Sequence, residues 1–528
     1  MKNSRFLSTL VAGGAALALA LAGPSCNCGG GGGDDGGQDG GDDAGITNQV
    51  LEFHGGASRA GNFVDPTLTR AYVPTSGFHL DPAFGGAASG AVYAQPLYFE
   101  NTGGQPDLVV VATESNNVYA FNATTGAVVW QKNVGTAMPK SGLPCGNISG
   151  TTNGITGTPV IDPAARVVYL DAEVAVNPGP ATHHQVFALS LDDGSTVAGW
   201  PVDINTKAVA GSVTFNAPPQ GQRSALSLLN GTLYVPFGGR AGDCGSYHGW
   251  VVGISTSNPS SVTSWATRAG ASGIWAVGGL ASDGTNLYGA TGNAIGATGY
   301  GDQESVIRFA PGPAYSQANA DHYVPSNWQS LDSGDTDISG SGPLLVDMPG
   351  STPSALLVQF GKDGNAYLVN RSNMGGQGGE LQNLHVAGNS IIQAGAVYRT
   401  PAATYVAMSA NGANCASGSG DLHVLKVNPG SPPQLASAWC ALQSAGPPAP
   451  PGRGSPIVTT TDGLHEAIVW SVGSGDGRLR AFDGDTGTRL FQSTDAVTGV
   501  HAYNTFVILA KGRFYVAGDN RLFSFIRQ

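Results

Sequence analysis

The fold is decided by a repeating stretch whose clearest copy is Leu108-Val-Val-Val-Ala-Thr-Glu-Ser-Asn-Asn-Val-Tyr-Ala-Phe-Asn-Ala-Thr-Thr-Gly-Ala-Val-Val-Trp130. It contains an apolar strand, a polar turn, a second apolar strand and a Thr-Gly turn that leads to a tryptophan. Short apolar runs separated by Gly, Asn and Asp are typical of antiparallel hairpins. The same order returns at Ala467–Phe491, where Phe491 takes the place of Trp130.

Weaker copies of this unit fill the rest of the chain. They are Val167–Leu191, Thr232–Ser255, Asn286–Ala310, Ala355–Asn370, Thr404–Asn428 and Gly512–Phe525. Most are preceded by a further strand with a Gly-x-Pro or similar step, as at Gly157–Asp162 and Gly454–Val458. About eight units at a spacing of roughly 50–65 residues indicate a β-propeller, because a small sheet cannot bury both of its faces alone.

We therefore predict an all-β chain, an eight-bladed propeller of four-stranded antiparallel blades, over residues 49–528. The last unit ends at the C-terminus and is short of a strand. We expect the segment Val50–Phe63 to supply that strand and to close the ring.

Composition agrees with this fold and excludes some classes of partner. Glycine accounts for 80 of the 528 residues, and charged residues for 11%. Ordinary soluble domains contain about half that share of glycine and roughly 25% charged residues, so a helical protein is disfavoured. The formal net charge of −12 disfavours binding to nucleic acid or to an anionic membrane surface.

Residues 1–25 have the pattern of a bacterial export signal. Lys2 and Arg5 form a basic start, and an apolar run of Ala, Leu and Gly covers Phe6–Gly23. Cys26 then follows Leu21-Ala-Gly-Pro-Ser25, which is similar to a lipoprotein signal whose cysteine is lipidated. The alternative, a retained membrane-spanning anchor, is disfavoured because the run is short.

The match to a lipoprotein signal is imperfect, since Gly23 and Pro24 stand at the −3 and −2 places. Cys28 is a second candidate for lipidation, and cleavage near Ala22 would give a secreted protein. Residues 26–48 are then expected to form a disordered tether, because Gly29–Gly45 is almost entirely Gly and Asp and cannot bury apolar surface.

Four further cysteines suggest two disulfides in an oxidising compartment. They are Cys145, Cys244, Cys415 and Cys440. Three pairings are possible, of which Cys415 with Cys440 closes a short local loop and leaves Cys145 with Cys244 to join neighbouring loops. The sequence contains no Cys-x-x-Cys motif, so a zinc ribbon has no support.

The unit Val118-Tyr-Ala-Phe-Asn-Ala-Thr-Thr-Gly-x-x-x-Trp130 resembles the repeat of the quinoprotein-like (PQQ-repeat) eight-bladed propellers. In that family the tryptophan packs between adjacent blades, a place that Trp130 fits. From about His54 onward, the chain also looks like a bacterial family of exported PQQ-like propellers of poorly defined function. The segments that carry this resemblance are Ile155–Asp162, Gln222-Arg223, Tyr247–Trp250, Gly273–Trp275, Thr291–Asn293 and Gly361–Gly364.

The resemblance makes pyrroloquinoline quinone (PQQ) and calcium candidate cofactors. Catalytic members of the family have adjacent cysteines over the quinone, a tryptophan beneath it, and Glu, Asn and Asp around calcium. No adjacent cysteine pair is present in this sequence. Asn293, Asp302, Asp335 and Asp337 offer the oxygen ligands that calcium takes, although we favour the alternative that these residues cap turns.

Several polar or aromatic residues near predicted strand ends could line a central funnel. They are Arg223, His248, Trp250, Trp275, Lys362, Arg399 and Arg453. Arginine and tryptophan at the axis would suit a planar or anionic ligand. The simpler interpretations are blade packing for the tryptophans and internal ion pairs or carbonyl contacts for the cations. His183-His184 is expected to lie in a solvated loop.

The sequence favours a monomeric, lipid-anchored and non-catalytic propeller of the cell envelope that binds a protein or a glycan. It contains no GxSxG, HExxH or Walker A motif. The alternatives are a periplasmic PQQ-dependent oxidoreductase, and a hydrolase or lyase with paired carboxylates on the propeller axis.

Overall fold

The computed structural model describes residues 49–146, 150–176, 181–294, 296–412, 415, 420–443, 454–473, 475–501 and 507–528. The expected export signal, the expected tether, Cys26 and Arg453 lie outside these residues. No helix in the described part of the chain is long and apolar enough to span a bilayer.

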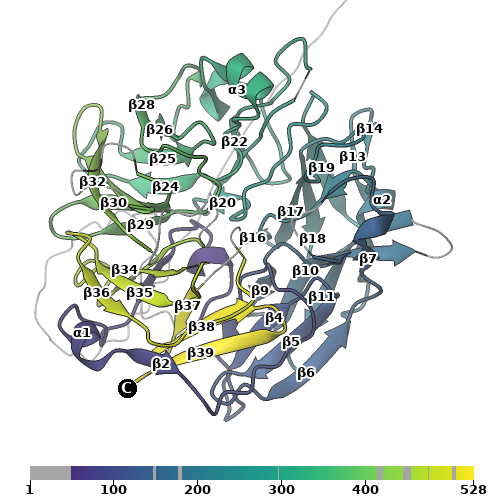
Figure 1. Cartoon of the computed structure of the whole chain (residues 1–528). Helices are drawn as coiled ribbons and strands as arrows, with labels where there is room; N and C mark the ends of the chain where they lie inside the picture. The colour runs from purple at the N-terminus through teal and green to yellow at the C-terminus, as the bar shows by residue number, and fades with distance from the viewer. Residues whose placement is uncertain are drawn as a thin grey trace, which may run out of the picture. The chain divides into compact units, whose positions relative to one another are not determined.

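The described residues form an eight-bladed β-propeller, as the repeats predict (Figure 1). Each blade is a sheet of four or five strands in mostly antiparallel order, and we number the blades along the chain. Blade 1 has β3 (Leu97–Phe99), β4 (Leu108–Ala112), β5 (Asn117–Asn122) and β6 (Val128–Asn133); blade 2 has β9 (Val160–Asp162), β10 (Val167–Val176), β11 (Ala181–Ser190) and β12 (Val202–Asp203); blade 3 has β15 (Gln220–Gly221), β16 (Ser227–Leu229), β17 (Thr232–Gly239), β18 (Trp250–Ser255) and β19 (Val262–Ala266); blade 4 has β20 (Ala281–Ser282), β21 (Leu287–Ala290), β22 (Val306–Phe309), β23 (His322–Val324) and β27 (Gly376–Gln377).

The second half of the ring repeats this arrangement. Blade 5 has β24 (Leu344–Asp347), β25 (Ala355–Phe360), β26 (Asn365–Asn370) and β28 (Gln382–His385); blade 6 has β29 (Ala396–Arg399), β30 (Thr404–Ser409), β31 (Leu422–Asn428) and β32 (Gln434–Ala441); blade 7 has β33 (Ile457–Thr460), β34 (Ile468–Val472), β35 (Leu479–Asp483), β36 (Arg489–Gln492) and β1 (Asn62–Val64); blade 8 has β37 (Val507–Ala510), β38 (Arg513–Gly518), β39 (Arg521–Arg527) and β2 (Phe78–Leu80).

Short elements join and decorate the blades. The helices are α1 (Tyr72–Ser76), α2 (Ile204–Lys207) and α3 (Trp328–Gly334), the 3-10 turns are η1 (Phe53–Gly55), η2 (Lys140–Gly142) and η3 (Asn319–Asp321), and two small hairpins pair β7 (Met138–Pro139) with β8 (Thr152–Asn153) and β13 (Val209–Ala210) with β14 (Val213–Thr214). The first strands of neighbouring blades, such as β20, β24 and β29, contact one another and therefore line the centre of the ring.

The apolar core is divided into clusters that lie between neighbouring blades. Trp130 shows how this docking works: its indole N–H donates to the carbonyl of Leu191 in the next blade (2.7 Å), and its ring lies against Gly194. A β-carbon on Gly194 would lie 2.6 Å from the ring, and the residue has a φ of +71°, so glycine is required there. The inter-blade role expected for Trp130 is confirmed.

Trp439 repeats this docking between blades 6 and 7, which the sequence pattern did not show. Its indole N–H donates to the carbonyl of Gly484 (2.9 Å), and its ring lies against Gly487. A break in the strand register precedes the docking aromatic residue in these blades, at Ala120/Phe121 and at Val424/Leu425. The bulge re-aims the side chain toward the next blade.

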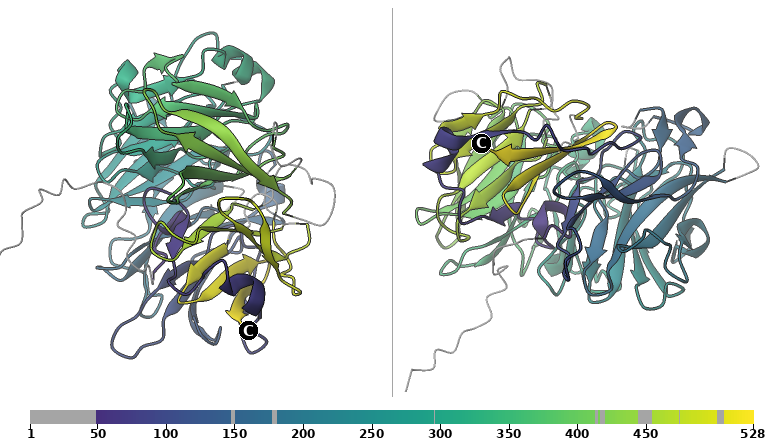
Figure 2. Two further views of the ribbon diagram at one scale, coloured as in Figure 1. Left: turned by 90° about the vertical axis from the view of Figure 1, so that its left-hand side faces the viewer. Right: turned by 90° about the horizontal axis from the view of Figure 1, so that it is seen from below.

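The ring closes with a different segment from the one expected from the sequence. β2, at Phe78–Leu80, pairs antiparallel with β39 and supplies the outer strand of blade 8. Figure 1 shows this purple strand beside the yellow C-terminal strands, and both views of Figure 2 show the same two parts of the chain side by side. The expected segment Val50–Phe63 instead reaches the inner edge of the sheets, where β1 pairs parallel with β33 and Val50 bridges Tyr98 of β3. The prediction was wrong because an inner and an outer edge strand have similar apolar patterns.

The turn η1 packs against residues that precede the innermost strands. Phe53 is fully buried against Ala225, Val277 and Ala394. Arg59 anchors the same segment by donating to the carbonyl oxygens of Leu226 (2.9 Å) and Leu280 (3.1 Å). The N-terminal segment therefore fills the centre of the propeller and forms a floor beneath the residues described next.

Candidate functional site

Two neighbouring cavities lie among the loops that precede the innermost strands. The smaller, about 290 Å³, is called the funnel cavity, and its lining residues are Arg223, Arg240, Ala241, Gly242, Asp243, Trp275, Val277, Asp335, Asp337, Gly340, Lys362 and Ile392. The larger, about 1070 Å³, is called the outer cavity, and it shares Gly242 and Asp243 with the first. Val277 of the funnel cavity packs on Phe53, so η1 lies directly beneath it.

The structure brings together five residues that the sequence singled out separately. Arg223, Trp275 and Lys362, expected at the funnel, line the funnel cavity together with Asp335 and Asp337. Arg223 lies at the start of blade 3, and Trp275 at the entry to blade 4. Lys362 lies in the β25–β26 turn, and the two aspartates lie between α3 and β24. The antiparallel topology places all of these turns at one end of the strands.

Lys362 joins the two aspartates at the funnel. Its Nζ lies 2.8 Å from Asp335 Oδ1 and 2.5 Å from Asp337 Oδ2. Asp337 is fully buried, and its other oxygen accepts from the backbone N–H (3.1 Å) and hydroxyl (2.9 Å) of Ser339. Burial by itself would lower the pKa of the Lys362 ammonium, but the carboxylates of Asp337 and Asp335 raise that pKa above its ordinary value. Lys362 is therefore charged and paired.

Trp275 forms one wall of the funnel cavity but offers little open ring surface. Its indole N–H donates to the carbonyl of Gly239 (2.8 Å), and its own carbonyl accepts from Nε of Arg223 (3.0 Å). The residue is only 6% exposed because its ring packs against Gly238 and Gly273, where a β-carbon would approach it within 2.6 Å. These glycines are needed for the close approach of backbone to ring.

A buried ionic network adjoins the funnel cavity on the side of blades 1 and 2. Both guanidinium ends of Arg240 contact the Glu173 carboxylate, one of them at 3.0 Å, and both side chains are fully buried. Glu114 lies nearby and accepts from the backbone N–H of Gly154 (2.7 Å) and the hydroxyl of Thr156 (2.8 Å). Burial raises the pKa of Glu114 to about 7.

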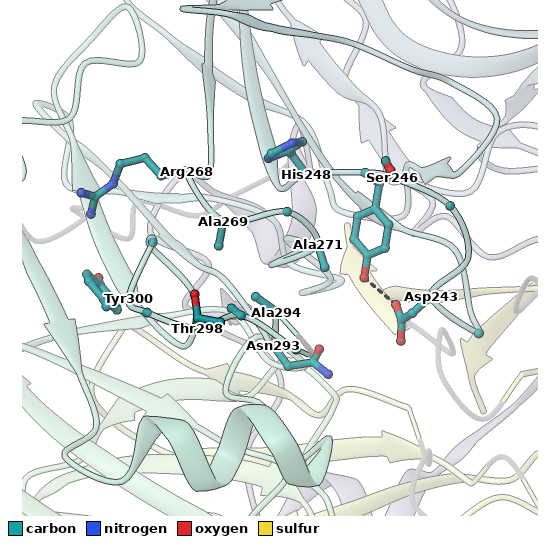
Figure 3. A pocket seen from close by; sticks show the side chains of 18 residues that line it. Asp243, Ser246, His248, Arg268, Ala269, Ala271, Asn293, Ala294, Thr298 and Tyr300 are labelled. Carbon is teal, nitrogen blue, oxygen red and sulfur yellow. Dashed lines mark hydrogen bonds between the residues drawn. The ribbon is translucent and has the colours of Figure 1, made fainter.

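The outer cavity carries a different set of groups (Figure 3). Arg268 and Tyr300 lie on one side and Asp243 on the other, with His248 and Asn293 between them. Arg268 is bound through two nitrogens to Asp302, at 2.7 Å for the shortest contact. Asn293 is buried, and within the part of the chain that the structure describes neither its amide nitrogen nor its amide oxygen has a hydrogen-bond partner. This side chain could therefore serve an incoming ligand as both donor and acceptor.

The cavity loops also hold unusual backbone conformations. Six of the described non-glycine residues with positive φ lie in or beside these loops: Asp243, Ala271, Ser272, Asp302, Glu304 and Asp335. Such conformations are costly and tend to gather where a protein builds a functional site.

Other predicted residues lie elsewhere. His248 lines the outer cavity rather than the funnel, and its Nδ1 contacts the carbonyl of Thr267 (2.8 Å). Arg399 ends β29, at the opposite end of the innermost strands, and donates to the carbonyl of Asp347. Trp250 is buried in the core beside Phe215. It therefore serves blade packing, the simpler of the two interpretations that the sequence offered for it.

His183 and His184 do not lie in a solvated loop. Both belong to β11, and alternation along the strand buries His184 while His183 stays partly exposed. Each imidazole contacts an aspartate, His184 with Asp171 at 2.8 Å and His183 with Asp203 at 2.6 Å. The expectation was wrong because the long strands β10 and β11 extend farther than their apolar cores indicated.

Sequence reasoning missed three buried carboxylates near the cavities, Glu114, Glu173 and Glu304. Oε2 of Glu304 accepts from the backbone N–H of Ile338 (3.0 Å), while Oε1 of Glu304 is buried and has no hydrogen-bond partner among the described residues. Burial and then the Asp337 carboxylate raise the pKa of Glu304 well above its ordinary range. The run Gly301-Asp-Gln-Glu-Ser305 just before an apolar strand was the only available signal.

Both expected disulfides form, with the pairing Cys145–Cys244 and Cys415–Cys440. The Cys145–Cys244 disulfide joins the loop after η2 to the loop that contains Gly242 and Asp243. These two residues line both cavities, so the disulfide fixes a loop of the cavity wall. Among the described residues, the one group of three metal-ligating side chains is Cys415, His423 and Cys440. Its two cysteines are joined in the disulfide, so they are not available as thiolate ligands.

The fold matches that of known enzymes. The structure superimposes on the quinohemoprotein alcohol dehydrogenase of Comamonas testosteroni with a TM-score of 0.60 and 13% identity, over 92% of this chain and 81% of the other. The chain has the fold of the quinoprotein alcohol dehydrogenases. The related enzyme ADHIIG of Pseudomonas putida HK5 gives 0.59 and 13%, over 91% and 80%. A europium-containing methanol dehydrogenase gives 0.57 and 15%, over 89% of each chain. At such identities the likeness shows the fold alone, and no protein-family model and no curated protein matches the sequence.

Calcium and the quinone do not fit the side chains as they are arranged. Asp302, Asp335 and Asp337, the weak calcium candidates, are each paired with a cationic side chain: Asp302 with Arg268, and the other two with Lys362. Calcium would have to displace an ammonium or guanidinium group. A planar quinone would need an open face of Trp275, which is only 6% exposed. The carboxylates of the quinone would also enter a cavity that is lined by three aspartates as well as three cations.

Proposed function

We propose that the chain is an exported binding protein of the cell envelope that recognises a protein or glycan partner at its funnel face and performs no chemistry of its own. The pairing of fixed charges at the funnel cavity carries this proposal. Lys362 is neutralised by two aspartates and Arg240 by Glu173. Charges that are already paired and hydrogen-bonded shape a recognition surface, whereas a general base or a cofactor clamp needs groups left for the substrate.

The anchoring part of the proposal rests on the N-terminal sequence. Cys26 would carry the lipid, and residues 26–48 would act as a flexible tether between the membrane and the propeller. The two disulfides are in keeping with an oxidising compartment outside the cytoplasm. A monomer remains our expectation, because a closed propeller leaves only short strand edges.

A PQQ-dependent oxidoreductase is the second candidate. It is supported by the fold and by two buried polar side chains, Asn293 and Glu304, that have atoms without a hydrogen-bond partner among the described residues. In that case Trp275, Lys362 and Arg223 would hold the quinone, which supplies hydride-acceptor chemistry when bound. The pairing of Lys362 with Asp335 and Asp337 argues against this candidate, because its ammonium group is already neutralised by two carboxylates.

The first test separates the two candidates with the purified full chain. The chain is mixed with quinone and calcium, and absorbance is followed together with thermal melting. The binding proposal predicts neither a bound chromophore nor a rise in Tm at millimolar ligand. Uptake of the chromophore with a raised Tm, lost in Trp275→Ala, would contradict it and establish the oxidoreductase.

The second test places the partner. A photo-crosslinking residue at Ser246, which lines the outer cavity, is compared with one at Thr124, an exposed residue in the β5–β6 turn at the opposite end of the strands. The proposal predicts a specific crosslinked species in intact cell envelopes from position 246 only. Its molecular mass after glycosidase or protease treatment distinguishes a glycan from a protein. Equal crosslinking from both positions, or none from 246, would overturn the assignment of the face.

A further inference from the structure

In blade 6 a buried imidazole adjoins one of the two disulfides. His423 of β31 stands directly opposite Cys440 of β32 in the antiparallel ladder, so the two side chains lie on the same face of the sheet. The disulfide brings Cys415 to the same place from the loop between β30 and β31. The ligand atoms of the three side chains all lie within 4.8 Å of one another. None of these residues lines the funnel cavity or the outer cavity.

The backbone of Gly412 leaves room for this cluster. A β-carbon on Gly412 would lie 2.5 Å from the Cys440 sulfur and 3.2 Å from Cγ of His423, so a larger residue would press on both ligands. The N–H of Gly412 donates to the carbonyl of Gly420 (3.0 Å), which closes the base of the loop that contains Cys415. The cluster is therefore held between two strands and a loop whose ends are joined.

The hydrogen bonds of His423 leave one ring nitrogen with an exchangeable partner. The imidazole is fully buried, and its Nδ1 lies 2.9 Å from the carbonyl oxygen of Val386. Because a carbonyl only accepts, Nδ1 carries the proton and Nε2 carries the lone pair, which accepts from the hydroxyl of Ser437 (2.8 Å). Metal-binding histidines commonly donate their second ring N–H to a backbone carbonyl in this way.

The sheet holds two of the three ligands without help from the disulfide. The ladder between β31 and β32 runs from Leu422 opposite Ala441 to Asn428 opposite Gln434, and it fixes His423 against Cys440. Cys415 is partly exposed, so an attacking thiol can reach its sulfur. Opening the disulfide therefore frees two thiols beside an imidazole and leaves the strands of the blade paired.

We propose that Cys415, Cys440 and His423 form a redox-gated zinc site, which the disulfide closes and the dithiol opens. A dithiol reductant opens it in two exchanges. Its first thiolate attacks the sulfur of Cys415 and expels the thiolate of Cys440, and its second thiolate then displaces Cys415. The reductant ends as a disulfide, and the protein gains two electrons and two protons. Zinc binding releases both protons, and two thiolates and an imidazole leave the fourth tetrahedral position to water.

The second disulfide provides a matched control on the same chain. Cys145 and Cys244 are also joined, but no third metal-ligating side chain adjoins this pair among the described residues. Reduction should therefore give two thiols without a zinc site there. The proposal does not depend on the proposed binding function, because its test needs no partner.

The first test titrates the full chain with cobalt(II), a spectroscopic probe of zinc sites, before and after reduction with a phosphine. We expect one equivalent to bind the reduced chain with a thiolate-to-cobalt charge-transfer band that zinc abolishes, and no such band in the oxidised chain. Cys145→Ser with Cys244→Ser should keep the band, and Cys415→Ser with Cys440→Ser should lose it. The proposal is overturned if the reduced chain shows no band, or if the second pair of substitutions leaves it.

The contribution of His423 is measured by affinity. His423→Gln should weaken cobalt binding by about tenfold or more, since losing even a residue behind a metal ligand commonly costs that much. Ser437→Ala removes the hydroxyl that competes for Nε2 and should bind cobalt at least as tightly as the unmodified chain. Equal affinity of His423→Gln and the unmodified chain would mean that the imidazole is not a ligand.

Cysteine alkylation tests the site without any variant and so covers the case in which a substitution prevents folding. The reduced, unmodified chain is treated with iodoacetamide with and without zinc, and the modified cysteines are mapped by mass spectrometry. Zinc should slow alkylation of Cys415 and Cys440 by about tenfold or more and leave Cys145 and Cys244 unchanged. Equal protection of all four cysteines, or protection of none, would overturn the proposal.

Discussion

Lys362 and Lys511 form the same local contact in two different environments. Each ammonium lies 2.5 and 2.8 Å from two carboxylates, which for Lys511 belong to Glu100 and Asp107. At Lys362 one partner, Asp337, is fully buried in the funnel wall. At Lys511 both partners remain partly exposed, at the end of the innermost strand β37. Equal distances therefore do not imply equal contributions to the free energy of unfolding, because desolvation decides how much stability is lost when one partner of an ion pair is removed.

The fully buried ion pair of Arg240 and Glu173 should give the largest loss of stability when its cation is removed. Arg240→Met would leave the Glu173 carboxylate buried and without its cation, so we expect a loss of about 4 kcal/mol in unfolding free energy. Urea unfolding followed by tryptophan fluorescence measures it. The matched control is Arg166→Met, whose partner Asp192 is exposed, and it should cost under about 1 kcal/mol. Equal costs for the two variants would show that burial is not the deciding factor.

Glu114 shows what happens to a buried carboxyl group that is held by a backbone N–H and a hydroxyl, with the nearby Arg240 bound to Glu173 instead. Its pKa is raised to about 7 by burial, against 4.5 ordinarily. Because the folded-state pKa is the higher one, the folded chain keeps a proton that the unfolded chain releases, and stability falls as pH rises from about 4.5 to about 7. The fall amounts to about 3 kcal/mol.

The change Glu114→Gln removes this titration. We expect the pH profile of the unfolding free energy to flatten between those two pH values in the variant, with the unmodified chain measured in parallel. A profile with the same slope in both chains would mean that Glu114 does not carry the effect.

Removing the ammonium group of Lys362 or of Lys511 should give the next largest difference in unfolding free energy. Lys362→Met should lower the unfolding free energy by about 2 kcal/mol, less than a fully buried pair because Lys362 is partly exposed. Lys511→Met should lower it by less than about 1 kcal/mol. The prediction fails if Lys511→Met is the more damaging of the two.

The smallest expected effect separates the two partners of Lys362. Asp335 is 62% exposed, so Asp335→Asn should change the unfolding free energy by less than about 0.5 kcal/mol, whereas Asp337→Asn should cost more. Raising the salt concentration to 1 M should weaken the Asp335 contact and leave the Asp337 contact largely intact. Identical salt dependence of the two variants would contradict the assigned burial.

The sequence was a good guide where local pattern and tertiary structure agree. The Val-Tyr-Ala-Phe-Asn repeat predicted the strands through their two-residue period and turn glycines, and the number of repeats predicted the blade count. The docking of Trp130 was expected only from the resemblance to the PQQ-repeat propellers. The disulfide pairing was among the possibilities that cysteine spacing allowed.

What could not be predicted depends on which loops meet in space. The sequence suggested Arg223, Trp275 and Lys362 as funnel residues but not the pairing of Lys362 with Asp335 and Asp337, since these stand 25 or more positions apart in chain order. Glu304 carries no motif at all, because its importance comes from burial alone. The closing strand was misplaced for a similar reason: pairing partners at the two ends of a chain are set by the ring and not by local pattern.

The central claim is that the funnel contains its own cation, and anomalous diffraction tests it most directly. Crystals of the unmodified chain would be soaked in calcium or a lanthanide, and the anomalous map would be inspected between Asp335 and Asp337. We predict no anomalous peak there, with the ammonium of Lys362 in contact with both carboxylates. A metal ion ligated by Asp337, with Lys362 displaced from the pair, would contradict the account.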